Sequence, residues 1–220
     1  IATGSCFSNT LRCMAVSHLH QGEGLMNTIV SHLLEHQYMQ GNTHVFLYTK
    51  CSSAKFFSSL GFHEIVRIED QIVFMENSRT GFKSWLNSLE KKEGSRVSAI
   101  VMNANPFTLG HQYLAEQASA GSDVVHLFVV SEDRSLFPFS VRRKLVEEGT
   151  APLNNIIIHD SGPYIISNAT FPSYFQKNEE AVITSHAMLD LSVFVKIAKQ
   201  LDINCRFVAE EPKSIVTGIY

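Results

Sequence analysis

A short apolar run followed by a turn with proline and glycine decides how this chain folds: Val97-Ser98-Ala99-Ile100-Val101-Met102-Asn103-Ala104-Asn105-Pro106-Phe107-Thr108-Leu109-Gly110-His111. Its first six residues are typical of a buried β-strand, and residues 110–120 have the pattern of a helix. Because residues 103–111 leave a strand and enter a helix, they occupy the crevice in which open α/β sheets bind ligands. The sequence therefore predicts a ligand-binding turn here.

The turn contains groups that suit a phosphate. Free backbone N–H groups at the start of the helix would point at phosphate oxygens, and Gly110 lets the backbone approach closely. His111, protonated or as a hydrogen-bond donor, would stabilise charge that develops on an α-phosphate as pyrophosphate leaves. The alternative is a proline-containing turn with Thr108 as the N-cap of an ordinary helix, and the local pattern leaves both interpretations open.

Strands and helices alternate through the C-terminal half of the chain. Strands are expected at residues 97–102, 124–130, 155–159 and 205–208, and helices at residues 110–120, 140–149 and 181–200, the last with a break near His186. This alternation predicts a parallel sheet with helical crossovers. We therefore expect a Rossmann-like α/β domain in residues 93–220.

The N-terminal block has a different pattern. An apolar strand at residues 11–16 is followed by the turn Gly22-Glu23-Gly24 and a helix at residues 25–40. A short β-rich run, a short helix and a hairpin that ends at Glu76 complete the block. This mixture predicts an α+β domain in residues 1–92, with the boundary in the polar connection around residues 84–95.

Composition limits the classes of partner. The chain has 220 residues, a net charge of -3 and 45% apolar residues, with no block of five like charges. We therefore expect neither a nucleic-acid nor a membrane-surface partner. The longest apolar runs are much shorter than the roughly 18 to 20 residues that cross a bilayer. Four scattered cysteines and no signal peptide predict a reduced, cytoplasmic protein.

The turn at residues 103–111 resembles the H-x-G-H or T-x-G-H signature of the cytidylyltransferase-like nucleotidyltransferase superfamily, with Thr108 in the first His position. Thr108 can donate a hydrogen bond to phosphate but carries no charge. His111 is therefore expected to contribute more than Thr108 to stabilising the negative charge of the phosphate.

A longer segment resembles the citrate lyase ligase family. It is Gly162-Pro163-Tyr164-Ile165-Ile166-Ser167-Asn168-Ala169-Thr170-Phe171-Pro172-Ser173-Tyr174-Phe175, and Arg206-Phe207-Val208-Ala209-Glu210-Glu211-Pro212 follows it. Ala209 replaces the family's glycine. The resemblance implies use of ATP, magnesium and acetate to acetylate the prosthetic group of the citrate lyase acyl carrier protein, with AMP and pyrophosphate released. Rival interpretations are an adenylyltransferase for a phosphorylated cofactor precursor and a non-catalytic carrier-protein or coenzyme A binding module.

The resemblance also implies site residues. Catalytic roles would fall to His111, Thr108 and Lys177, and ATP contacts to Asn103, Asn105, Pro106, Phe107, Gly110, Arg143, Ser167, Thr170 and Glu211. Among Arg142, Arg143 and Lys144 we expect one side chain at the phosphates and two on a solvated helix face. Lys177 is alternatively a surface lysine.

Other acidic and imidazole groups are metal candidates. Asp160 and Glu210 follow strands and would hold magnesium through water. The same magnesium ion would also bind the ATP phosphates. His186 and Asp190 lie four apart on a helix, a spacing that suits a metal pair, a proton relay or a structural hydrogen bond.

The first block resembles an acetyltransferase-like (GNAT) domain. Gln21-Gly22-Glu23-Gly24-Leu25-Met26 follows the Q-x-x-G-x-G/A pattern, in which backbone N–H groups hold the pyrophosphate of coenzyme A. The resemblance implies acetyl-coenzyme A or coenzyme A contacts from Val16, Gln21, Gly22 and Gly24. Met26 stands where a small residue is expected, so the alternative is a glycine turn in a domain that docks the carrier.

Both ends of the chain depart from the family pattern. The chain begins with Ile1, and it ends before the Ser/Thr-rich, Arg-containing segment with which the family contacts the triphosphate. We therefore expect an acetyltransferase-like domain without its N-terminal part and a nucleotidyltransferase domain without its C-terminal part.

Overall fold

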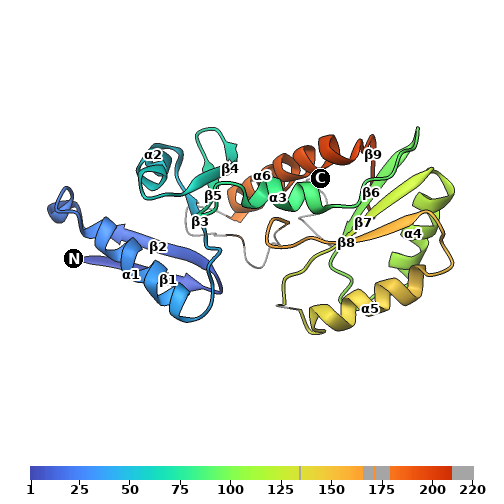
Figure 1. Ribbon diagram of the computed structural model, residues 1–220, viewed down its shortest axis with the longest axis horizontal. Helices are drawn as coiled ribbons and strands as arrows, with labels where there is room; N and C mark the ends of the chain where they lie inside the picture. The colour runs from blue at the N-terminus through green and yellow to red at the C-terminus, as the bar shows by residue number, and fades with distance from the viewer. Residues whose placement is uncertain (134, 166–170, 172–178, 210–220) are drawn as a thin grey trace. The chain divides into compact units, whose positions relative to one another are not determined.

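The computed structural model describes residues 1–133, 135–165, 171 and 179–209 (Figure 1). The chain divides into two compact units, one of Ile1–Lys83 with Pro172–Leu189 and one of Ser84–Phe171 with Asp190–Tyr220. We call them the first unit and the second unit. The sequence predicts two independently folding domains with a boundary between residues 92 and 93. That boundary stays a prediction.

The described part of the first unit contains a five-stranded mixed sheet in the order β1-β2-β3-β5-β4. Its strands are β1 (Ala2–Phe7), β2 (Thr10–Val16), β3 (Phe46–Thr49), β4 (His63–Ile68) and β5 (Ile72–Glu76). Helix α1 (Leu25–Met39) lies along β1 and β2, and α2 (Cys51–Ser59) packs on β4 and β5 (Figure 1). The predicted hairpin is the antiparallel pair β4–β5.

Apolar side chains from both helices and the central strands form the core of the first unit. Its fully buried members include Leu11, Val30, Leu47, Val73 and Met75. Strands β3 and β5 are buried along their whole length, and both consist largely of β-branched and aromatic residues, which suit a covered sheet. Burial of these side chains stabilises the sheet, since each contributes roughly 1.5–3 kcal/mol when removed from water.

Strands β2 and β3 pair over a very short length. They run parallel and align at two positions, Thr10 with Phe46 and Leu11 with Leu47. Cys13 then adopts a left-handed conformation with φ of 51°, which interrupts regular strand geometry. The C-terminal ends of the two strands are therefore not joined by ladder hydrogen bonds.

The second unit is built on a parallel sheet, as the alternating pattern predicts. Its described strands are β6 (Val97–Met102), β7 (Val124–Val129), β8 (Ile156–Asp160) and β9 (Cys205–Phe207), in the order β8-β7-β6-β9. All three strand pairs are parallel. Every residue of β7 is buried, as expected for a parallel strand covered on both faces.

Helices cover the second unit's sheet on both faces. On one face, α4 (Leu109–Ala120) and α5 (Phe139–Thr150) pack through Ala115, Ala118 and Val146 onto the apolar side chains of β6 and β7. Helix α6 (Glu179–Leu201) contributes Val193, Ile197 and Leu201, all fully buried. Figure 1 shows α4 and α5 on the same side of β6 and β7.

Three details differ from the sequence-based expectation. Helix α6 is continuous, so the expected break near His186 is wrong, because residues 179–201 contain neither proline nor glycine. Strand β1 was not expected, since its side chains are mostly exposed and show no apolar alternation. The short elements η1 (His18–His20) and α3 (Gly81–Ser88) complete the description.

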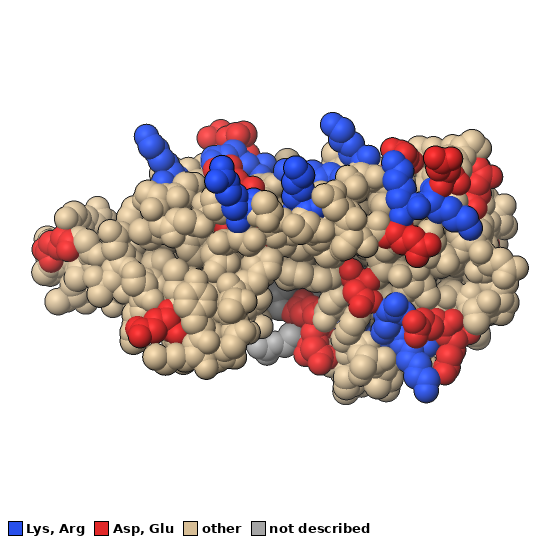
Figure 2. Space-filling model, in the orientation of Figure 1, with Lys and Arg blue, Asp and Glu red and all other residues tan. Residues whose placement is uncertain are grey.

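The predicted fold class is confirmed. An α+β unit with a mixed sheet precedes an α/β unit with a parallel sheet. Among the described residues, no helix is both long and apolar enough to span a membrane. On the face shown in Figure 2, Lys and Arg side chains are interspersed with Asp and Glu.

Candidate functional site

A cavity lies at the carboxyl ends of β6 and β9, where the strand order reverses. The chain adds β7 and β8 on one side of β6 and then places β9 on its other side. Ligands of open α/β sheets bind at such a switch point. The cavity has a volume of about 450 Å³ and is lined by Val101, Met102, Asn103, Ala104, Asn105, His111, Leu114, Arg206, Val208 and Ala209.

The turn into α4 supplies one wall of this cavity. Thr108 is the N-cap of α4, and its extended backbone turns the chain into the helix. The imidazole Nδ1 of His111 accepts a hydrogen bond from the Thr108 backbone N–H at 3.1 Å, and it lies 2.8 Å from the Thr108 hydroxyl. Since Nδ1 is an acceptor, the ring proton is on Nε2. Nε2 is therefore the ring nitrogen that can donate in this geometry.

Phe107 has a packing role. Its ring lies 5.8 Å from the ring of His111 and is partly buried against the core of the second unit. A Cβ atom at Gly149 of α5 would lie 2.9 Å from Phe107 Cδ1, so the aromatic ring fills the space that the glycine leaves. Phe107 thus packs against the core of the second unit and is a stacking neighbour of the His111 ring.

Gly110 is placed as predicted, at the first turn of α4. It is exposed, and the nearest atom to a Cβ built on it would be Thr108 Oγ1 at 3.7 Å, an ordinary van der Waals distance. The fold itself therefore leaves room for a side chain at this position. A glycine is required here only if something else approaches the backbone.

Asn103 and Asn105 hold a neighbouring segment. Asn103 and Ser135 are joined by side-chain hydrogen bonds of 3.1 and 3.2 Å, and the Asn105 carbonyl oxygen Oδ1 accepts from the Phe137 backbone N–H at 3.0 Å. Asp133 caps the start of α5 by accepting from the Phe139 N–H at 2.8 Å. The two predicted ATP contacts thus also fix the loop between β7 and α5.

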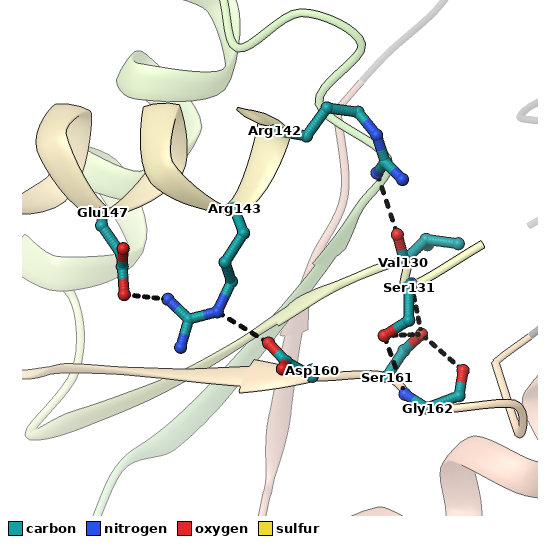
Figure 3. Close-up of polar contacts among 8 residues, drawn as sticks. All are labelled: Val130, Ser131, Arg142, Arg143, Glu147, Asp160, Ser161 and Gly162. Atoms are coloured by element: carbon teal, nitrogen blue, oxygen red, sulfur yellow. Dashed lines mark hydrogen bonds and ion pairs between the residues drawn. The ribbon is translucent and has the colours of Figure 1, made fainter. Parts of the chain in front are cut away.

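The three consecutive basic residues of α5 have different surroundings. Arg142 is fully buried and donates to backbone carbonyls, whereas Lys144 is exposed and pairs with Glu148 at 3.7 Å. Figure 3 shows Arg143 reaching from α5 between Glu147 and Asp160, with Nε donating to Asp160 at 2.6 Å. The Nε and Nη1 groups of Arg143 are thus engaged by these two carboxylates.

Burial and neighbouring charges shift the pKa values of Arg142 and Arg143 in opposite directions. Burial lowers the pKa of Arg142, while the carboxylates of Asp133 and Glu132 oppose that shift. Burial also acts to lower the pKa of Arg143, but Asp160 and Glu147 outweigh it and raise that pKa. Both guanidinium groups stay charged at neutral pH.

Arg206 lines the cavity, although no role is predicted for it from the sequence. It follows Cys205 on β9 and lines the cavity together with His111. Its guanidinium pairs with Asp190 at 3.4 Å and lies 4.4 Å from the centre of the Phe194 ring. Asp190 therefore balances the charge of an arginine at the cavity. The sequence signal for this role was a basic residue, Arg206, within the last predicted strand, which pairs with β6 in the structure.

The described residues do not form a metal-binding cluster at the predicted sites. Among the described residues, no group of three or more His, Cys, Asp or Glu side chains could hold a metal ion. Asp160 pairs with Arg143, and both His186 and Asp190 are buried on α6. The predicted site residues Ser167, Thr170, Lys177 and Glu211, and the metal candidate Glu210, lie outside the described residues.

A buried histidine pair lies within the same sheet. His126 Nδ1 and His159 Nε2 are 2.8 Å apart on the adjacent strands β7 and β8. Burial lowers the pKa of His126 to about 4, and burial together with the His126 ring lowers the pKa of His159 to about 4. Both rings are therefore neutral at pH 7, and they pack in the core of the second unit.

A second cavity lies in the first unit, between the ends of β2 and β3 that have no ladder hydrogen bonds. Its volume is about 710 Å³, and it is lined by residues of β2, of β3 and of the turn into α1, including Val16, Gln21, Gly22 and Gly24. Gly22 and Gly24 have φ of 89° and 76°. The four predicted coenzyme A contacts therefore share one cavity, and Met26 lines it as well.

The comparisons with known proteins agree in the family that they indicate. Residues 97–220 match the family model described as the citrate lyase ligase C-terminal domain. The whole chain is 41% identical over 223 residues to the citrate (pro-3S)-lyase ligases of Escherichia coli strain K12 and Klebsiella pneumoniae, and 39% identical to that of Haemophilus influenzae. The chain spans 63%, 65% and 67% of the length of these three relatives.

Solved structures show more distant likenesses. The ribosomal-protein-S18-alanine N-acetyltransferase of Escherichia coli is 21% identical over 34% of this chain and 57% of its own, with a TM-score of 0.30. A bifunctional NMN adenylyltransferase/ADP ribose pyrophosphatase of Francisella tularensis is 16% identical over 56% of this chain and 39% of its own, with a TM-score of 0.33. The family rests on the sequence matches alone.

Proposed function

The chain belongs to the citrate lyase ligase family, and from that membership we propose that it acetylates the citrate lyase acyl carrier protein. In this proposal ATP activates acetate as acetyl-adenylate, and the thiol of the carrier's prosthetic group then takes the acetyl group. AMP and pyrophosphate are released. We place this reaction in the cytoplasm, with acetate and the carrier as partners and without nucleic acid or membrane.

One observation carries the ATP part of the proposal. The 450 Å³ cavity lies at the switch point between β6 and β9, and it is lined by His111 from the first turn of the 12-residue helix α4. Backbone N–H groups and the helix dipole favour an anion at such a position. Arg206 lines the same cavity, and its guanidinium, paired with Asp190, would offer N–H donors to a phosphate.

In the first step an acetate oxygen attacks the α-phosphorus and the bond to pyrophosphate breaks. His111 would donate its Nε2 proton as a hydrogen bond to an α-phosphate oxygen, because Thr108 holds Nδ1 as an acceptor. A donor already aimed at the developing charge costs no reorganisation in the transition state. Catalysis thus rests on positioning and charge, and no covalent enzyme intermediate forms.

In the second step the carrier thiol attacks the carbonyl carbon of acetyl-adenylate, and AMP leaves with the bonding electrons. The thiol loses its proton in this step. Magnesium, when bound to the ATP phosphates, would neutralise part of their charge. Because the described residues hold no cluster of metal ligands, we propose that the phosphates themselves carry most of its coordination.

Acetate-dependent exchange of labelled pyrophosphate into ATP tests the first step directly. The proposal expects exchange with acetate and ATP in the absence of the carrier, and acetylation of the carrier thiol when it is added. Exchange that requires a phosphorylated pantetheine instead of acetate would identify an adenylyltransferase. ATP binding by calorimetry without turnover of any acid would identify a non-catalytic module.

A second candidate function is favoured by the cavity of the first unit. Its 710 Å³ volume, the diverging strands and the glycine turn suit a coenzyme A-type ligand whose pyrophosphate would meet the start of α1. We propose acetyl-coenzyme A or coenzyme A as that ligand. Calorimetric titration with each compound tests this ligand assignment. The absence of a binding heat for both compounds would favour the alternative, in which the domain docks the carrier protein.

A further inference from the structure

Arg142 is fully buried near the N-terminus of α5, although it belongs to a run of three basic residues. Its guanidinium donates five hydrogen bonds to residues of the same unit. Nε donates to the Phe137 carbonyl at 3.1 Å, and Nη2 donates to the Glu132 carbonyl at 2.6 Å. Nη1 reaches the Asn103 carbonyl at 2.7 Å and the Val130 carbonyl at 2.9 Å.

These acceptors come from three segments around the candidate ATP site. Asn103 directly follows β6, Val130 and Glu132 follow β7, and Phe137 precedes α5. Arg142 Nη1 also donates to the side-chain oxygen of Asn103 at 3.0 Å, and the same Asn103 side chain is hydrogen-bonded to Ser135. One side chain thus ties the turn that enters α4 to the loop that enters α5.

The neighbouring arginine makes a useful contrast. In Figure 3, Arg143 extends toward Glu147 and Asp160, whereas Arg142 points to the carbonyl of Val130 at the end of β7. Figure 3 also shows Ser131, the next residue, bonded to Ser161 and Gly162 after β8. The strand ends beside the cavity are therefore joined to each other by polar contacts.

Only a guanidinium can make this set of contacts. Its donors lie in a fixed planar fork, so that one group reaches acceptors in several directions at once. A lysine ammonium has three donors on a single atom and cannot span carbonyls on both sides of the fork. With donors on Nε, Nη1 and Nη2 all engaged by this unit, Arg142 is suited to holding the loops.

We infer that Arg142 is a positioning residue for ATP, which holds Asn103 together with Val130, Glu132 and Phe137 in the arrangement that the reaction needs. The inference rests on the proposed function and deepens it, since it explains how a turn of small polar residues keeps its geometry. Arg142 acts through Asn103 and through the loop, without contact with the reacting atoms. A displacement of about 1 Å in such a site can lower the rate by about 100-fold.

The test compares Arg142→Lys with Lys144→Gln in the whole chain, by acetate-dependent exchange and thermal unfolding. Lys144 is exposed on the same helix, so its variant should keep the wild-type rate. Arg142→Lys should lower kcat by about 100-fold in the folded fraction, with a change in the KM for ATP of less than about ten-fold. In Arg142→Ala, added guanidinium should restore at least about one tenth of the lost rate.

Asn103→Ala keeps the inference testable if the Arg142 variants do not fold, because Asn103 is exposed. It should lower kcat by itself, and its effect should be less than additive with that of Arg142→Lys, since both variants remove the hydrogen bond from Arg142 Nη1 to Asn103 Oδ1. A wild-type kcat in folded Arg142→Lys, no rescue of folded Arg142→Ala, or a wild-type kcat in Asn103→Ala would overturn the inference. Absence of acetate-dependent exchange in the unaltered chain would instead contradict the proposed function.

Discussion

The two units each present a strand, a glycine-containing turn and a helix N-terminus at a cavity, yet they build this feature differently. In the first unit, the turn into α1 depends on glycines with positive φ, 89° at Gly22 and 76° at Gly24. In the second unit, the turn into α4 is held by side chains, those of Asn103, Asn105 and Arg142. The first turn takes its positive φ angles at glycines, whereas the second takes one at Ala104, with φ of 50°, and is also held by side-chain hydrogen bonds.

The glycines of the two turns show what this difference means. Gly24 is the N-cap of α1 in the left-handed region, where a side chain costs roughly 1 kcal/mol, so the fold itself favours glycine. Gly110 has neither a positive φ nor a neighbour that would exclude a Cβ atom. The fold therefore explains the glycine of the first turn, whereas no contact within the described fold requires the glycine of the second.

Replacing His111 tests the second turn most severely. His111→Ala removes the proposed Nε2 donor, and loss of one such donor lowers the rate by about 100- to 1,000-fold. We expect that loss in acetate-dependent exchange, with an unchanged circular dichroism spectrum. His32→Ala, at an exposed position on α1, is the matched control. Wild-type exchange in His111→Ala would remove the catalytic site from this turn.

The buried histidine pair predicts that acid weakens the second unit. His126 and His159 have folded pKa values of about 4, whereas an unfolded histidine titrates near 6.5, so the unfolded state binds more protons between these values. Stability should be complete above pH 6.5 and should fall as the pH drops to 4, by up to about 1.4 kcal/mol per pH unit for each histidine.

Urea unfolding from pH 7.5 to 4, followed by probes in each unit, measures this dependence. The double variant His126→Leu with His159→Leu removes both partners together, which is far less costly than orphaning one. Its stability should vary less with pH than that of the unaltered chain. An equal slope in both proteins would show that other groups cause the acid sensitivity.

Gly110→Ala separates ligand from fold in the second turn. Because a Cβ atom fits, and alanine is favoured over glycine in a helix by roughly 1 kcal/mol, the variant should be as stable as the unaltered chain or slightly more stable. The KM for ATP in the exchange assay should nonetheless rise by about ten-fold, which corresponds to about 1.4 kcal/mol. An unchanged KM would mean that no phosphate approaches this backbone.

Gly24→Ala gives the smallest expected effect and belongs to the first turn. The positive φ at this position should cost about 1 kcal/mol of stability, and coenzyme A binding by calorimetry should weaken. Gly24→Asn is the matched variant, because asparagine tolerates the left-handed region and serves as an N-cap. A change in ATP exchange for either variant would contradict the separate roles of the two turns.

The candidate site could be predicted from sequence where its residues are consecutive. Asn103, Asn105, Gly110 and His111 lie in one turn, and the apolar run before it matches β6 at both ends. Arg206 received no role, because its place beside β6 follows from the strand order, which the sequence does not state. The roles of the basic residues on α5 likewise depend on acceptors that are distant along the chain.

Local pattern also explains which elements were found. Helices and buried strands have apolar periodicity, so α4, β6 and β7 were expected nearly at their observed bounds. Strand β1 pairs with β2 through the backbone while its side chains stay largely exposed, and such a strand has no periodic signal. The expected break near His186 in helix α6 is absent, and the polar residues Ser185, His186 and Asp190 are buried within the continuous helix.

The sequence by itself determined the α+β and α/β units, the turn that joins β6 to α4 and, through its motifs, the family. Tertiary structure alone decided that Arg142 is buried among backbone carbonyls while Arg143 lies between carboxylates. The physical reason is that adjacent residues of a helix point about 100° apart, so their surroundings depend on which loops pack nearby. A sequence records neighbours along the chain, whereas hydrogen bonds and charge depend on neighbours in space.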